Sequence, residues 1–95
     1  MPRPPHCRRI EKTPAFTDFK PVGVPIGALE TVVMTLDEFE ALRLADFLGL
    51  YQEESAQRMG VSRPTFSRIV DSARRKVAQA LVLGRRLRVE GGMVA

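Results

Sequence analysis

QEESAQRMGVSRPTFSRIVD, residues 52 to 71, carries the residue pattern of a helix-turn-helix. Ala56 is small where two helices cross closely, and Gly60 suits the sharp turn because only glycine takes a positive φ at no cost. Ser62 is expected to cap the next helix, and Pro64 falls in its first turn, where a missing N–H does no harm. The second helix of such a motif normally lies in the DNA major groove, so the pattern indicates DNA binding.

A further helix is predicted before this motif. Thr35 and Glu38 form a capping box, in which each side chain can satisfy the other residue's backbone amide. The helix should continue to about Leu48 and end at Gly49, since glycine is a common helix terminator. Its apolar positions cover more than one stripe, which predicts burial on two sides. They are Leu36, Phe39, Leu42, Leu44, Ala45 and Phe47.

The two helices of the motif are predicted to span residues 52–59 and the stretch after Ser62 to Leu83, with Gly84 as the stop. Tyr51 stands where a Ser or Thr cap would be expected, and we expect its ring to pack on the protein rather than to touch a phosphate. The last helix is about 30 Å long, more than groove reading requires. Its second half should therefore pack on the first helix or on another subunit. Its apolar stripe is Phe66, Ile69, Val70, Ala73, Val77, Ala80 and Leu81.

The two ends of the chain favour extended structure. Six of the seven prolines lie in residues 1–29, which disfavours helix. β-branched and alternating patterns predict short strands. These strands are expected near 8–10, 16–20, 30–34 and 87–90, the last pairing with 31–34, with a frayed tail at 91–95. The fold class is thus mainly α, a winged-helix-like arrangement with a long third helix and short terminal strands. The expected domains are 1–34, 35–84 and 85–95.

Charge is unevenly distributed along the chain. The net charge is +4, made up of +3 in residues 1–29, −5 in residues 30–61 and +6 in residues 62–95. Positive charge therefore gathers at and after the second helix of the motif. Phosphates attract such a surface, although a solvated basic helix face would show the same pattern.

Several classes of protein are disfavoured. No apolar run approaches the ~20 residues of a membrane span, and no apolar stretch follows the basic N-terminus as in a secretory signal. A single cysteine cannot form an internal disulfide, which predicts a reducing cytoplasm. His6 and Cys7 are the only pair resembling metal ligands, and structural zinc usually needs four. With no phosphate loop and no nucleophile beside a histidine, we expect neither an enzyme nor a cofactor.

The candidate DNA contacts cluster at the start of the last helix. Arg63 and Arg68 can fork to guanine or clamp a phosphate. Alternatively, they pair at the surface with Glu53, Glu54 or Asp71. Residues further along, including Lys76, would serve phosphates rather than bases. The full set of expected contacts is Ser62, Arg63, Pro64, Thr65, Ser67, Arg68, Arg74 and Arg75.

The basic N-terminal segment has two possible roles. Arg3, Arg8, Arg9 and Lys12 could form an arm that enters the minor groove. The alternative, which we favour, is that the segment folds back over the core as strands.

The chain as a whole resembles an uncharacterised prokaryotic family of proposed DNA-binding proteins, known as domain of unknown function 134 or uncharacterised protein family 0251. The central segment also resembles the DNA-binding region four of sigma factors, which supports groove binding by analogy only. The resemblance implies no activity beyond DNA binding. The matching positions are Arg3-Pro4, Cys7–Ile10, Pro14, Phe19–Pro21, Gly23, Met34–Leu44, Gly49–Glu54, Met59–Phe66, Ser72–Val77, Ala80-Leu81, Gly84, Leu87 and Glu90–Gly92.

The sequence therefore predicts a transcriptional regulator that binds double-stranded DNA as a homodimer or larger symmetric oligomer, because one small motif makes few base contacts. Two alternatives remain open. One is a sigma-like interaction module that contacts RNA polymerase through the acidic middle of the chain. The other is RNA binding through the basic surface.

Overall fold

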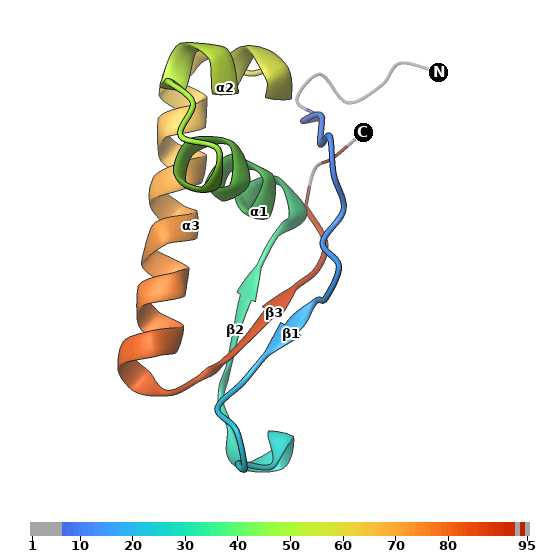
Figure 1. Cartoon of the computed structure of the whole chain (residues 1–95), viewed down its shortest axis with the longest axis vertical. Helices are drawn as coiled ribbons and strands as arrows, with labels where there is room; N and C mark the ends of the chain where they lie inside the picture. The colour runs from blue at the N-terminus through green and yellow to red at the C-terminus, as the bar shows by residue number, and fades with distance from the viewer. Residues whose placement is uncertain (1–6, 93, 95) are drawn as a thin grey trace.

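The structure, a computed structural model that describes residues 7–92 and 94, has three helices and a small three-stranded sheet (Figure 1). The expected mainly α fold with a long last helix and short strands is confirmed. The elements are β1 (Asp18–Phe19), η1 (Ile26–Ala28), β2 (Thr31–Met34), α1 (Leu36–Leu42), η2 (Arg43–Phe47), α2 (Gln52–Met59), α3 (Arg63–Leu83) and β3 (Arg86–Val89).

The first helix begins at the predicted capping box. The Thr35 hydroxyl accepts from the Glu38 amide, and the Glu38 carboxylate accepts from the Thr35 amide at 2.9 Å. The helix reaches its predicted end, but its last stretch, η2, is a π-helical turn. There the amide of Leu48 donates to the carbonyl of Arg43, five residues back. Such turns are rare in helices and shift every following side chain around the axis.

The turn of the motif also forms as predicted. Gly60 ends α2 with φ +69°, in the left-handed region that glycine allows. Ser62 caps α3, since its hydroxyl accepts from the Thr65 amide at 3.2 Å. Gly84 ends α3 with φ +65°. Both boundaries of the long helix therefore lie where the sequence predicts them.

Two buried clusters of apolar side chains hold these elements together. Phe66 and Val70 of α3 are fully buried. They form a cluster with Ala41 of α1, Leu44 of η2 and Met59 of α2. This cluster fixes the angle at which α1 and α2 cross α3 (Figure 1). The predicted stripe is thus correct over the first half of α3, where burial of large apolar side chains supplies most of the stabilisation.

The second half of α3 packs on both the sheet and α1, so the predicted packing on the first helix is correct. Strand order is β1-β3-β2, with β3 parallel to β2 and antiparallel to β1. Thr31 pairs with Arg86 and Met34 with Val89, which confirms the predicted pairing of these two strands. Met34, Ala73 and Val89 form a second buried cluster between the sheet and the helix. The strands that flank the helices in sequence therefore close the fold.

Two residues of the predicted apolar stripes lie outside the core. Phe47 is 81% exposed because the π-helical turn carries it away from the core side of the helix. Leu81 is 79% exposed, since only part of the last turns of α3 faces the strands.

The expectations for the termini need correction. Around Arg8 there is only an isolated bridge to Val94, and β1 spans two residues rather than five. The frayed tail is wrong at Gly91, because its carbonyl accepts from the Leu36 amide at 2.9 Å and so satisfies a free donor at the start of α1.

Candidate nucleic-acid interface

The start of α3 presents an ordered polar surface to solvent. Arg63, Pro64 and Arg68 are exposed. Beside them, the Ser62 hydroxyl donates to the Thr65 hydroxyl at 2.9 Å, and Arg68 donates to the same oxygen at 3.3 Å. The side chain of Ser62 is thus engaged in capping. A contact from Ser62 to a phosphate stays a prediction, for which its backbone amide is the freer group.

The basic side chains of α3 differ in whether a carboxylate neutralises them. Within the described part of the chain, Arg63, Arg68 and Arg75 are in no ion pair. The alternative pairing of Arg63 and Arg68 with surface carboxylates is not seen, since Glu54 binds Arg58 at 2.7 Å and Asp71 lies 3.7 Å from Arg74. The cations that do pair with carboxylates are Arg8, Arg43, Arg58, Arg74, Lys76, Arg85, Arg86 and Arg88.

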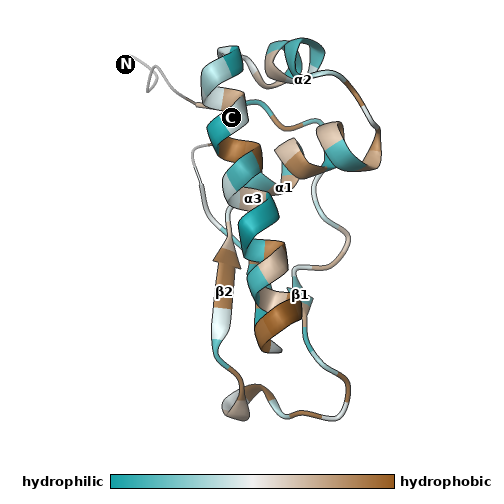
Figure 2. Ribbon diagram, turned by 90° about the vertical axis from the view of Figure 1, so that its left-hand side faces the viewer, coloured by the Kyte–Doolittle hydropathy of each residue, from teal (hydrophilic) through white to brown (hydrophobic). Residues whose placement is uncertain are grey.

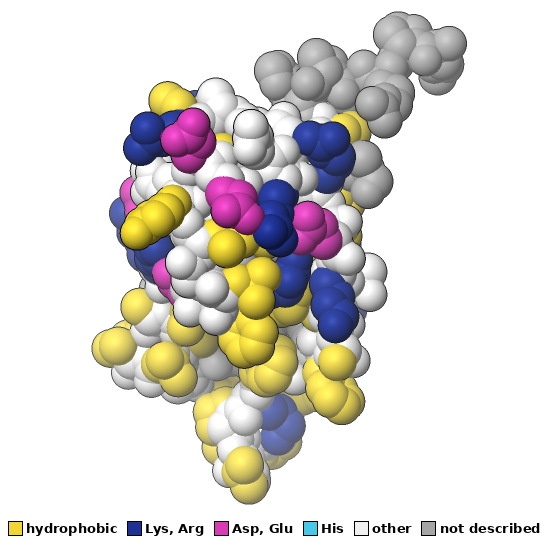
Figure 3. All heavy atoms as spheres, turned by 45° about the horizontal axis from the view of Figure 1, so that its top comes forward, with side chains coloured by type: hydrophobic (Ala, Val, Ile, Leu, Met, Phe, Trp, Pro, Cys, Tyr) yellow, Lys and Arg dark blue, Asp and Glu magenta, His cyan; other side chains and the backbone are white. Residues whose placement is uncertain are grey.

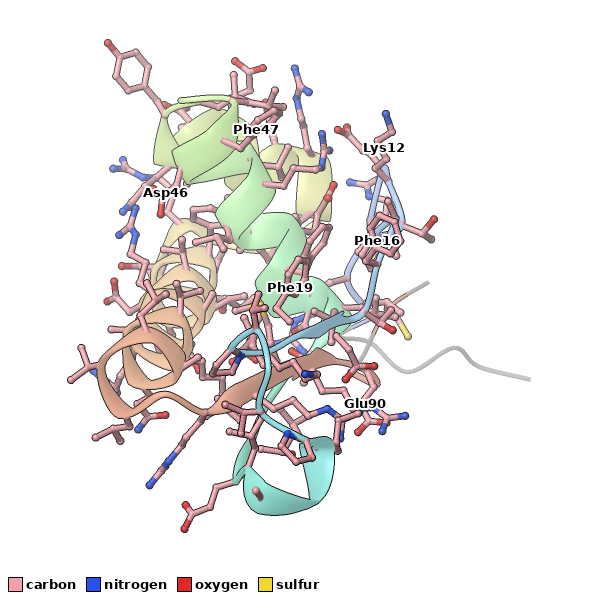
Figure 4. The ribbon with its side chains drawn as sticks, turned by 60° about the horizontal axis from the view of Figure 1, so that its bottom comes forward. Lys12, Phe16, Phe19, Asp46, Phe47 and Glu90 are labelled. Carbon is pink, nitrogen blue, oxygen red and sulfur yellow. The ribbon has the colours of Figure 1, made fainter. Side chains whose placement is uncertain are left out.

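Arg74 and Lys76 form ion pairs with acidic residues of η2 and α1, respectively. Arg74 makes two hydrogen bonds to Asp46, at 2.8 and 3.0 Å, which raise the pKa of Arg74 and lower that of Asp46 (Figure 4). Lys76 binds Glu38 at 2.7 Å. A phosphate would have to compete with these carboxylates, so Arg75 is the freer cation of this group. Contacts from Arg74 and Arg75 to DNA stay a prediction.

Glu38 connects the first helix to the third. Its carboxylate accepts from Lys76, from the Ser72 hydroxyl and from the Thr35 amide. Burial by itself would raise the pKa of this carboxyl. The three hydrogen bonds outweigh burial, so the pKa of Glu38 is lowered. The charge of Glu38 therefore stabilises the fold and positions α3.

This pKa shift predicts a pH dependence of stability. Because the folded-state pKa of Glu38 lies below its ordinary value of 4.5, its contribution is present above about pH 4.5 and is lost as the pH falls through the lowered value. Urea unfolding of the wild type and of Glu38→Gln across acidic pH should show a stability difference that shrinks as the pH falls. A difference that is constant across this range would contradict the assignment.

The N-terminal segment holds the motif from outside. The amide of Arg9 donates to the carbonyl of Met59 at 3.0 Å, and its guanidinium donates to that of Gln57 at 3.1 Å. Both carbonyls lie at the end of α2, where a cation is favourable. Glu11 continues the contact, since its amide donates to the buried carboxylate of Glu40 at 2.8 Å. The segment folds back over the helices, as we favoured, but without forming strands.

Two basic residues of this segment, Arg8 and Arg9, contact the protein itself, which makes them less available to a minor groove. Arg8 lies 3.9 Å from Asp37 and is mostly buried. Arg9 is engaged at α2, whereas Lys12 is exposed. Arg3 lies outside the described residues, as does His6 of the His6–Cys7 pair.

Gly60 meets two constraints at once, which gives a stability prediction. A Cβ at this position would lie 3.1 Å from the Arg9 guanidinium, which is a crowded contact. The positive φ of this residue is also unfavourable for any residue with a Cβ. We expect Gly60→Ala to destabilise the fold by about 1–2 kcal/mol in urea unfolding. Gly49→Ala is the matched control, because Gly49 has φ +72° and no atom within 4 Å of such a Cβ. A neutral Gly60→Ala would show that the turn relaxes freely.

Tyr51 lies at the start of α2 with its ring in solvent. It is 88% exposed and makes no capping hydrogen bond, so the expectation that it packs on the protein is wrong. An exposed tyrosine at this place is available to a phosphate or a partner. Neither its exposure nor the contact of Arg9 with α2 leaves a signal in the local sequence pattern.

A shallow hollow of about 400 Å³ lies beside Arg68. Arg8 and Arg68 line it, but so do the carboxylates of Asp37 and Glu38. An anion placed deep in this hollow would meet those carboxylates, so the hollow itself is a poor site for a phosphate. Over residues 7–92 and 94, no group of three potential ligands could hold a metal ion, and no helix is long and apolar enough to cross a membrane.

Comparison with known proteins places the chain in a family. The model of the family described as "Protein of unknown function DUF134" matches residues 1–95. The chain belongs to this family. A "UPF0251 protein" of Thermoanaerobacter pseudethanolicus is 60% identical over 97% of this chain and 78% of its own length. A relative from Moorella thermoacetica is 62% identical over 97% and 62%, respectively. No solved structure matches the chain.

Proposed function

We propose that this member of the family binds double-stranded DNA by placing the start of α3 in the major groove, and that it acts as a transcriptional regulator in the cytoplasm. The observation that carries the proposal is the set of unpaired arginines on α3. Arg63 and Arg68 lie within the first two turns of a helix whose entry is fixed by Gly60 and Ser62. Elsewhere in the described helices, Arg43 and Arg58 are neutralised by carboxylates.

The chemistry of these side chains fits duplex DNA. An arginine guanidinium can donate two parallel hydrogen bonds to the N7 and O6 atoms of guanine in the major groove. Ser67, half-buried on the same turns, can contact a base or the backbone. A guanidinium without a carboxylate partner gives up no ion pair when it binds. This difference favours Arg63 and Arg68 over Arg74.

The capping arrangement prepares the helix for contact with an anion. The hydrogen bonds among Ser62, Thr65 and Arg68 order the first turn before any ligand arrives. The amides at this end carry the positive end of the helix dipole, which favours a phosphate nearby. Tyr51 lies exposed at the start of α2, where it could contact the DNA backbone.

Selection from a random duplex pool tests this proposal. The full chain is incubated with random double-stranded DNA at physiological salt, and bound molecules are sequenced after several rounds. We expect an enriched motif whose symmetry reports the number of bound copies. Retention without enrichment that disappears as salt rises would mean phosphate attraction only. Preference for structured RNA, or binding to a polymerase subunit with no DNA retained, would contradict the proposal.

A further inference from the structure

The last turn of α3 exposes three large apolar residues in a row. Leu81 and Val82 are 79% and 80% exposed, and Leu83 is 56% exposed. Neither an acidic nor a basic residue lies in this turn. Figure 2 shows the hydrophobic colour at this end of α3, whereas the middle of the helix is hydrophilic. Adjacent exposed apolar residues that leave no polar face are unusual for a helix end in solvent.

A groove lies beside these side chains. It has a volume of about 400 Å³ and runs between the second half of α3 and the strands. Phe19, on β1, forms one wall and is half exposed; Figure 4 shows it directed toward the helices. The apolar residues that line the groove are Phe19, Pro21, Val77, Ala80, Leu81 and Leu87. We call these residues together with Val82 and Leu83 the distal patch.

The apolar area of the distal patch suits one protein interface. Its four most exposed side chains, Phe19, Leu81, Val82 and Leu83, offer an area on the order of 400 Å². A standard interface buries about 800 Å² on each partner, and somewhat more than half of that area is apolar. The distal patch therefore supplies the apolar centre of one ordinary interface.

The shape and charge of the distal patch suit a second copy of the same chain. Val82 and Leu83 lie beside a groove of matching polarity, so the patch holds both convex and concave parts, as a two-fold interface requires. The charge of Arg85 at the rim is compensated locally, because Arg85 binds Glu30 at 3.0 Å. The ammonium of Lys20 donates to the carbonyl of Val24 at 2.7 Å. The paired Arg85 therefore adds little like-charge repulsion between two copies, and the ammonium of Lys20 is held against its own chain.

We propose that two copies of this chain associate through the distal patch. The patch lies at the opposite end of α3 from Arg63, about 30 Å away along a 21-residue helix. Association there leaves the start of both α3 helices uncovered. The inference does not rest on DNA binding, because the area, shape and charge of the patch carry it, and it is tested in the absence of DNA.

Sedimentation equilibrium of the full chain without DNA tests this inference. Wild type is expected to show a reversible monomer–dimer equilibrium, and Val82→Glu to weaken it at least tenfold, because each dimer would bury two carboxylates in an apolar centre. Val82 is mostly exposed, so the variant should stay folded, as circular dichroism will verify. Gln57→Glu adds the same charge at an exposed site on α2 and should leave association unchanged.

Two results would overturn the inference. One is a wild type that remains monomeric at every concentration examined, which would mean that the patch has another occupant or none. The other is a dimer that Val82→Glu and Gln57→Glu affect equally. If the wild type dimerises but binds no DNA in the selection experiment, that result contradicts only the proposed function.

Discussion

Arg63→Ala and Arg68→Ala are each expected to weaken binding to a selected duplex by about 1–3 kcal/mol where the guanidinium contacts a base. Such a loss corresponds to roughly 5- to 150-fold in the dissociation constant. The effect should be large because neither side chain has a carboxylate partner within the described residues. Fluorescence anisotropy with a labelled duplex measures it, and circular dichroism verifies the fold of each variant.

The matched control is Arg88→Ala. It removes the same charge from β3, where Arg88 lies 3.5 Å from Glu90. We expect it to leave the affinity near that of wild type. Equal losses for Arg88→Ala and Arg68→Ala would mean that net charge, and not the start of α3, determines binding.

The salt dependence separates the two kinds of contact. Replacing a phosphate contact should lower the slope of log affinity against log salt by about one and weaken all sequences alike. Replacing a base contact should instead relax the preference at one position of the site. The same series with Arg74→Ala tests whether its pairing with Asp46 keeps it away from DNA.

Glu38→Ala is expected to destabilise the fold by about 3 kcal/mol. The substitution removes one half of the capping box and leaves the Lys76 ammonium and the Ser72 hydroxyl without their acceptor. Breaking a mostly buried pair from one side costs more than the pair contributes, because the remaining charge stays desolvated. Urea unfolding measures the change.

Two further variants make this prediction specific. Glu54→Ala removes a carboxylate from an exposed pair with Arg58 and should have a much smaller effect. Lys76→Met in the Glu38→Ala background should recover part of the lost stability, since no uncompensated ammonium then remains. A Glu38→Ala variant as stable as Glu54→Ala would show that this cluster is not a structural link between α1 and α3.

Local chemistry explains why much of the fold was predictable. The capping box at Thr35, the cap at Ser62 and the glycines at positions 60 and 84 act over a few residues, so their pattern is visible in the sequence. The pairing of β2 with β3 was also predicted, because the β-branched residues of one strand and the alternating pattern of the other lie on either side of the helices. The family was recognised from the same stretches.

Contacts between distant residues account for the features that the sequence did not predict. Arg9 meets the end of α2 from 48 residues away, and Arg74 meets Asp46 from 28 residues away. Neither pairing has a local pattern, so the sequence could not predict it, and a contact of Arg74 with a phosphate stays a prediction. The π-helical turn moves Phe47 off the core side, and no propensity in the sequence marks that turn. Figure 3 shows charged side chains of both signs close together on the upper part of this face and mostly hydrophobic ones below them.

The most direct test of the central claim is a nuclear magnetic resonance titration of the full chain with duplex DNA at physiological salt. Backbone amide shifts report which residues meet the ligand, even when the preferred sequence is unknown. The account predicts that the largest changes fall on residues 62–68, with smaller changes near Tyr51 and little change on β3. Unchanged amides at 62–68, or changes centred on the distal patch, would contradict it.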